Sequence, residues 1–156
     1  MAFDKAKKHL DGLGYGDRVK VFDVSSATVE LAAVAVGTEP ARIAKSLSFM
    51  VNEKAVIIVC AGDVKVNNGK YKAFFGTKAR MLTREEVHDL IGHDVGGVCP
   101  FGINEDVDVY LDESLKRFDI VYPACGSDNS AVKLSCEELF ETSGAKDWID
   151  VCVPMQ

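Results

Sequence analysis

The stretch SLSFMVNEKAVIIVC, residues 46–60, decides the fold, because it places two apolar segments on either side of a short polar link. Residues 46–51 and 55–60 each have the length and aliphatic content of a strand. Asn52, Glu53 and Lys54 form a link of the size that joins antiparallel neighbours. Two adjacent strands with so few polar residues are expected at the centre of a sheet. We therefore expect this hairpin at the centre of the molecule.

Periodicity and turn residues predict the elements around the hairpin. Upstream, they predict a helix over residues 3–13, a strand over 18–24, a helix over 29–36 and a short helical turn over 39–45. Downstream, they predict helices over 70–75, 85–91 and 136–141, and strands over 78–82, 107–111, 118–123, 130–135 and 148–153. Capping boxes, Thr83 with Glu86 and Ser135 with Glu138, are expected to open the last two helices.

This order of elements predicts an α+β fold. About seven strands, several joined as hairpins, are interleaved with short helices, which favours a mixed, mostly antiparallel sheet that curls toward a barrel. No repeat or Pro/Gly/Ser-rich linker interrupts the chain, so we expect a single domain over residues 1–156.

Composition restricts the classes of function. The chain has 156 residues and a formal net charge of −6, and no segment approaches the ~18 to 20 consecutive apolar residues of a membrane span. The N-terminus has an amphipathic helical pattern, which is not that of a signal peptide, so we expect a cytoplasmic protein. The acidic balance argues against general nucleic-acid binding, which needs clustered Lys and Arg.

The charge is unevenly distributed along the chain. Residues 1–63 carry eight basic and eight acidic side chains, residues 64–102 carry six and four, and residues 103–156 carry four and twelve. The middle block contains an uninterrupted basic run with no Asp or Glu inside it: Lys65, Lys70, Lys72, Lys78, Arg80 and Arg84. Such a run is typical of a solvated face. It is also the one basic stretch that could contact RNA.

The cysteines and histidines do not form a metal-binding pattern. Five cysteines without a C-x-x-C pair fit neither a disulfide framework nor a zinc site. His88 and His93 are five residues apart, which misses the spacing of two ligands on one helix face. We expect reduced thiols and no zinc site.

Two features have the character of a reaction site. In HDVGGVCPFGI, residues 93–103, adjacent Gly96 and Gly97 permit close approach of a ligand to the backbone, whose N–H groups could hold an oxyanion. Lys45 stands where the chain enters a central strand, so its ammonium could hold a phosphate or carboxylate. Taken separately, the loop also fits an ordinary surface turn and Lys45 an ordinary surface lysine.

The combination of motifs resembles the YbaK-like aminoacyl-tRNA editing family, which is also called the prolyl-tRNA-synthetase-associated or insertion-domain family. The resemblance covers nearly the whole chain. It rests on a series of blocks in the family's order and spacing, namely TVELAAVAVG, EPARIAKSLSF, AGDVKV, GGVCPFGI, VDVYLDESLKRFDIVYPACGS and VKLSCEEL.

The resemblance implies hydrolysis of the ester that joins a wrongly attached amino acid to the terminal ribose of transfer RNA. Lys45 matches the family's functional lysine, which is associated with the terminal nucleotide and the aminoacyl group. Gly96, Gly97 and Pro100 match the GGxxP motif, with Cys99 inside it, and its backbone receives the substrate carbonyl. Gly126, followed by Ser127, matches the glycine of a later loop at the same pocket. The partner implied is the acceptor end of aminoacyl-tRNA, with an aminoacyl-tRNA synthetase as a second candidate. The resemblance also implies no metal and no organic cofactor.

Two other functions remain open from the residues. Cys99 with His88 or His93 could form a thiol hydrolase with a Cys nucleophile and a His base. The same pocket could instead capture an aminoacyl end, or dock on a synthetase, without turnover. The aminoacyl ester is already activated, so orientation and oxyanion stabilisation could suffice without a protein general base.

Overall fold

The computed structural model describes residues 2–155. The expected hairpin lies at its centre and consists of β2 (Ile43–Val51) and β3 (Lys54–Ala61), paired antiparallel with Leu47 opposite Ile58. The link has two residues, because Lys54 already belongs to β3. Asn52 and Glu53 have φ values of 48° and 70°. Positive φ at both loop positions is typical of the turn whose twist matches that of the two strands.

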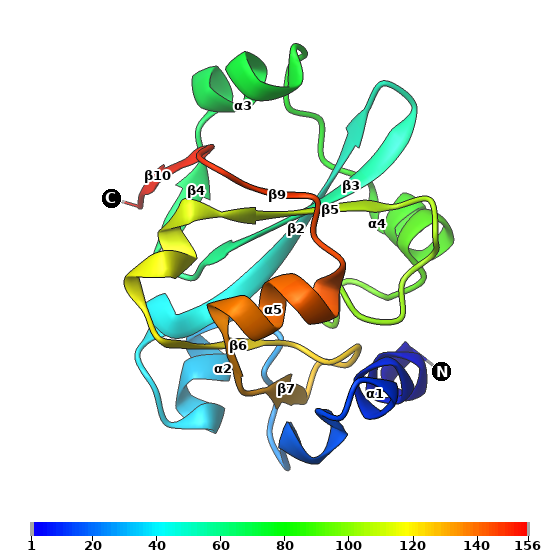
Figure 1. Cartoon of the computed structure of the whole chain (residues 1–156), viewed down its shortest axis with the longest axis vertical. Coiled ribbons are helices and arrows are strands. Elements are labelled where there is room, and N and C mark those ends of the chain that lie inside the picture. Colours follow the sequence, from blue (N-terminus) through cyan, green and yellow to red (C-terminus); the bar gives the residue numbers. More distant parts are fainter. Residues whose placement is uncertain (1, 156) are drawn as a thin grey trace.

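The hairpin is the middle of a six-stranded mixed sheet with the order β8-β6-β2-β3-β5-β9. The other four strands are β5 (Asp108–Asp112), β6 (Ile120–Pro123), β8 (Leu134–Ser135) and β9 (Asp147–Ile149). Neighbours pair parallel at β2/β6, β3/β5 and β5/β9, and antiparallel at β2/β3 and β6/β8. The sheet curls into a half-barrel (Figure 1).

Two further strand pairs lie outside this sheet and are both antiparallel. They join β1 (Val19–Val21) to β7 (Ser130–Val132), and β4 (Val64–Val66) to β10 (Cys152–Pro154). Four of the seven strand pairings are therefore antiparallel. The predicted α+β class with a mixed sheet that curls toward a barrel is confirmed, although three of the five pairings within the six-stranded sheet of residues 2–155 are parallel.

Within the described residues, five α-helices surround the sheet: α1 (Ala2–Gly12), α2 (Val29–Val36), α3 (Asn68–Phe75), α4 (Arg84–Glu86) and α5 (Cys136–Ser143). In Figure 1, α2 and α3 lie toward opposite ends of the molecule. Both predicted capping boxes are present, at Thr83 with Glu86 and at Ser135 with Glu138. A turn of π-helix, Val87–Ile91, continues α4, and short 3-10 turns occupy Gly16–Arg18, Pro40–Arg42 and Glu113–Arg117.

Several predicted boundaries differ from the structure. The strand expected over 78–82 is reduced to one bridge between Met81 and Phe49, because the chain leaves β2 at once to begin α4. The strand expected over 148–153 divides into β9 and β10. Asp112 accepts a hydrogen bond from Val151 N–H at 2.9 Å, which holds the chain at this division. The strand over 130–135 likewise divides into β7 and β8, and β4 was not predicted.

The core forms on β3, where Ile57, Ile58 and Val59 have no exposed surface. α1 and α5 contribute fully buried Leu10 and Leu139 to the same cluster. Within residues 2–155, none of the helices combines the length and apolar content needed to cross a membrane.

Candidate functional site

The edge of β2 that faces β6 is only partly paired. β6 meets β2 at Ile43 and Ala44 alone. Beyond that point the edge is bonded again where Leu82 N–H donates to Ser48 O at 3.1 Å and Met50 N–H donates to Arg80 O at 2.9 Å. Backbone groups alternate in direction along a strand, so the N–H and C=O of Ser46 face the gap between these pairings. The central sheet is therefore open at Ser46.

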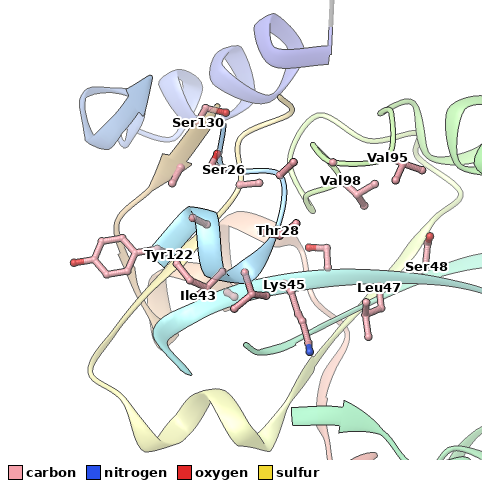
Figure 2. A pocket seen from close by; sticks show the side chains of 18 of the residues that line it. Ser26, Thr28, Ile43, Lys45, Leu47, Ser48, Val95, Val98, Tyr122 and Ser130 are labelled. Carbon is pink, nitrogen blue, oxygen red and sulfur yellow. The ribbon is translucent and has the colours of Figure 1, made fainter. Parts of the chain in front are cut away.

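A cavity of about 340 Å³ lies at this opening. Its walls come from residues 43–48 of β2, residues 26–29 before and at the start of α2, Gly96 and its neighbours, and residues 130–131 of β7 (Figure 2). Apolar side chains and hydroxyl groups make up nearly all of the lining. Among residues 2–155, Lys45 is the one charged side chain in the lining.

The glycine loop takes its shape from close backbone packing. A Cβ atom on Gly97 would lie 2.7 Å from Ser127 N and 2.8 Å from Gly126 C, so only glycine permits this approach. Gly126 has φ +79°, and a Cβ there would meet Ala2 O at 2.6 Å. The structure thus brings the predicted GGxxP loop and the predicted later loop into contact.

The two adjacent N–H groups expected at Gly96 and Gly97 are not both free. Gly97 N–H donates to Asp94 O at 3.0 Å, which closes a turn, and Gly97 is buried behind the lining. Gly96, with φ +101°, and Val98 do line the cavity. Within residues 2–155, neither of their N–H groups has a hydrogen-bond partner. Gly96 and Val98 are therefore available donors of the loop in this structure.

The Lys45 ammonium is held at the border of the cavity. Its Nζ donates to Val64 O and, at 3.5 Å, to Gly62 O, and it lies 3.7 Å from Met155 Sδ. In Figure 2 the Nζ points to the opposite side of β2 from Val95 and Val98. Two carbonyls use two of the three ammonium protons, so one donor remains for a ligand.

The Lys45 charge is not neutralised by the acidic residue that lies between its two carbonyl partners. Asp63, between the two carbonyls that Lys45 contacts, forms a bidentate ion pair with Arg117 at 2.6 and 3.0 Å. This hydrogen-bonded pair lowers the pKa of the Asp63 carboxyl below its usual value. Within the described part of the chain, no carboxylate lies within ion-pair distance of Lys45. Its charge is thus available to a phosphate.

Cys99 lies next to a histidine, but the pair cannot act as nucleophile and base. Cys99 Sγ is 3.4 Å from His93 Nε2, and both side chains are buried. His93 Nε2 also lies 2.7 Å from Phe101 O, and a carbonyl only accepts, so Nε2 carries the proton and cannot take another. Burial raises the pKa of the Cys99 thiol well above its usual value and lowers the pKa of His93. The geometry therefore argues against a thiol hydrolase.

The remaining predicted residues lie around the cavity and not in its wall. Cys99 and Pro100 are buried behind the glycine loop, where they support it and do not face the cavity. Gly126 and Ser127 pack against Gly97. His88 is exposed and contacts Asp94 at 2.7 Å, and this contact raises the pKa of His88.

Sequence reasoning missed the hydroxyl groups of the lining. Ser26 and Thr28 precede the helix predicted over residues 29–36, and the Thr28 hydroxyl caps that helix by accepting a hydrogen bond from Leu31 N–H at 3.2 Å. Ser46 and Ser48 were expected only as part of a strand. Their alternation within an otherwise apolar strand is the one local signal that could have revealed a polar cavity wall.

Residues 24–142 match the sequence family described as the aminoacyl-tRNA editing domain. The chain belongs to this family. The matched range contains every residue that lines the cavity, from Ser26 to Ala131. The predicted resemblance to the YbaK-like editing family is confirmed.

The relatives of this editing domain include separate proteins and parts of synthetases. It is 50% identical over 153 residues to the uncharacterized protein YwhH of Bacillus subtilis, covering 97% of this chain and 98% of that protein. It is 30% identical over 148 residues to a proline–tRNA ligase of Bacillus cytotoxicus, covering 92% of this chain but only 24% of the ligase. A solved structure named as a candidate trans-editing enzyme for prolyl tRNA synthetase superposes with a TM-score of 0.87 at 32% identity, over 96% of both chains.

The basic run does not act as one free patch. Two of its members are ion-paired, Lys70 with Asp150 and Arg80 with Glu86, each at 3.0 Å. The other four are exposed and have no ion-pair partner among residues 2–155, namely Lys65, Lys72, Lys78 and Arg84. They come from β4, α3, the segment after α3, and α4.

Proposed function

We propose that this editing domain acts in trans as an aminoacyl-tRNA deacylase, which hydrolyses the ester between a wrongly attached amino acid and the terminal ribose of transfer RNA. One observation carries the proposal. The central sheet is open at Ser46, beside a cavity of about 340 Å³ in which Lys45 is the one charged side chain from the described part of the chain. Such a site fits an aminoacyl group with an uncharged side chain, with the anionic nucleotide at the border of the cavity.

Backbone amides are the groups available to polarise the ester carbonyl. Gly96 and Val98 face the cavity from one side, and Ser46 N–H faces it from the sheet edge. Fixed N–H donors that face a developing oxyanion stabilise the tetrahedral intermediate because they need not reorient during the reaction. Gly97 contributes by allowing the loop to approach Ser127, and its own N–H holds the turn.

The reaction needs no nucleophile from the protein. Within residues 2–155, no carboxylate, histidine or cysteine lines the cavity. A water molecule, or a hydroxyl or thiol group of the substrate, attacks the ester carbonyl carbon. When water attacks, the C–O bond to the ribose breaks and the ribose oxygen leaves with a proton from the water. Lys45 holds a phosphate of the terminal nucleotide, which fixes the ester relative to the amides.

The test is loss of the ester from a panel of mischarged transfer RNAs incubated with the purified protein. The supporting result is turnover with at least one member. Lys45→Met, which keeps the length of the side chain and removes its charge, is expected to lower hydrolysis about 10- to 100-fold through the lost charge-assisted contact. Lys8→Met is the matched control, because Lys8 is exposed on α1 and does not line the cavity.

Two outcomes contradict the proposal. Binding of aminoacyl-tRNA without ester loss for any amino acid would identify a binding module. Equal loss of activity in Lys45→Met and Lys8→Met would show that Lys45 acts only through the general charge of the surface. The synthetase to test as a partner is proline–tRNA ligase, because the ligase of Bacillus cytotoxicus contains a segment that is similar to this chain.

A further inference from the structure

Two hydroxyl groups lie together at one end of the cavity. Ser26 stands before α2 and Ser130 begins β7, and both line the cavity. Ser26 N–H donates to Asp128 O at 2.6 Å, which ties the two segments together. Their exposed fractions are 8% and 1%. Figure 2 shows both at the end of the cavity remote from Ser48.

The hydrogen bonds around Ser130 determine which of its groups are free. Asn129 Nδ2 donates to Phe22 O at 3.2 Å, so Asn129 Oδ1 faces Ser127 and accepts its O–H at 2.9 Å. A serine has one proton. The 2.6 Å contact between Ser127 and Ser130 must therefore use the proton of Ser130. The oxygen of Ser130 is left as an acceptor.

Ser26 supplies the hydrogen-bond donor that complements the Ser130 acceptor. Its Oγ is buried and has no hydrogen-bond partner among residues 2–155. A buried hydroxyl without a partner destabilises the folded protein, so its presence in a cavity wall calls for a ligand. Ser26 can donate to a ligand and Ser130 can accept from it. One hydroxyl group on the ligand, which is both donor and acceptor, satisfies both serines.

This end of the cavity adjoins the place where the ester carbonyl is expected. A Cβ atom on Gly96 would lie 3.7 Å from Ala27 Cβ and 3.7 Å from Asp128 Cβ, so the glycine loop meets both segments that carry the two serines. An aminoacyl side chain attached to a carbonyl near Gly96 can therefore extend toward Ser26 and Ser130. The short distances around Gly96 leave room for a short side chain at this end, where Ala27 and Ala131 also belong to the lining.

We infer that Ser26 and Ser130 form a hydroxyl-recognition subsite, and that the esters for which this cavity is built carry serine or threonine. The inference rests on the proposed deacylase function. The two serines would select the amino acid through hydrogen bonds to its side-chain hydroxyl. A site built to form hydrogen bonds with a hydroxyl group discriminates strongly against an analogue that lacks this group.

The experiment measures kcat/KM for seryl, alanyl, threonyl and valyl esters prepared on one proline-specific transfer RNA. Serine and alanine differ by one hydroxyl group, and threonine and valine have nearly the same shape. Seryl over alanyl, and threonyl over valyl, are each expected to be favoured at least about 10-fold. In Ser26→Ala the seryl-to-alanyl ratio should fall toward 1, because only the seryl ester loses a partner.

The matched control is Ser25→Ala, a substitution at the exposed neighbouring serine, which does not line the cavity and should leave both ratios unchanged. Thermal unfolding of each variant shows that it is folded at the assay temperature. The ratios of the parent protein test the inference even if Ser26→Ala does not fold.

Three results overturn the inference. They are a parent ratio near or below 1, an equal decrease for seryl and alanyl esters in Ser26→Ala, and a loss of discrimination in Ser25→Ala as large as that in Ser26→Ala. The second would mean that Ser26 contacts a group common to all aminoacyl esters. If the parent cleaves alanyl and valyl esters well, only this inference fails. If no ester on the transfer RNA is cleaved, the deacylase proposal fails with it.

Discussion

Gly97→Ala separates two loops that the site needs in contact. The added Cβ would lie 2.7 Å from Ser127 N and 2.8 Å from both Gly126 C and Ser127 Cα. All three are backbone atoms, so no side chain can rotate to make room. Ordinary carbon contacts are ~3.5 to 4.0 Å, so the loops must move apart by about 1 Å.

The magnitude follows from this displacement. Forcing a methyl group into a well-packed site costs about 1–3 kcal/mol in the free energy of unfolding. For a chain of this length, 1 kcal/mol corresponds to ~2–4 °C, so the melting temperature should fall by about 2–12 °C. A misplacement of about 1 Å at a reacting centre can lower turnover ~100-fold, which is the decrease expected for ester hydrolysis.

The assay has two parts. Calorimetry or circular dichroism gives the melting temperature of each variant. Hydrolysis of the preferred ester is then measured about 15 °C below the melting temperature of the variant, so that the variant is folded during the assay. Gly12→Ala is the control, because a Cβ at Gly12, the last residue of α1, would meet no atom within 4 Å. The reasoning is refuted if Gly97→Ala retains both the melting temperature and the turnover of the parent protein.

Two further predictions concern the buried pair behind the glycine loop. Cys99→Ser should retain hydrolysis within about twofold, because the thiol is buried and His93 Nε2 already donates to Phe101 O. A folded variant without turnover would instead support the hypothesis that Cys99 is the nucleophile. Burial lowers the pKa of His93 in the folded protein below 6.5, its value in the unfolded chain. Between these two pKa values the unfolded chain binds more protons than the folded protein does. The free energy of unfolding should therefore decrease as the pH falls through this range. Denaturant unfolding at pH 7.5 and 5.5 should show a smaller decrease for His93→Gln than for the parent, and identical decreases would contradict a buried neutral His93.

Local signals predicted most of the elements correctly. The hairpin of β2 and β3 follows from two apolar runs and a short link, and the capping boxes follow from residue pairs three apart. Predictions failed where a segment's structure depends on a distant partner. Met81 was placed in a strand because its neighbours alternate, but only one bridge to Phe49 forms there.

The site was predicted less completely than the fold. Lys45, Gly96 and the contact between the two glycine loops could be expected from the resemblance of the motifs. The engagement of Gly97 N–H by Asp94, and the position of Cys99 behind the loop, depend on turns that no residue pair in the sequence specifies. The serine hydroxyls of the cavity wall were missed because serine is common in caps and strand ends.

The sequence by itself determined the α+β class, the central hairpin, the family and the glycine positions at which close approach occurs, because each depends on residues near one another in the chain or on motifs in a fixed order. Tertiary structure alone decided that β6 pairs with β2 over only two residues, which leaves the sheet open at Ser46. It also decided that Ser26 and Ser130, more than a hundred positions apart, line the same end of the resulting cavity. Such pairings depend on packing across the whole sheet, so they are not readable from any single segment.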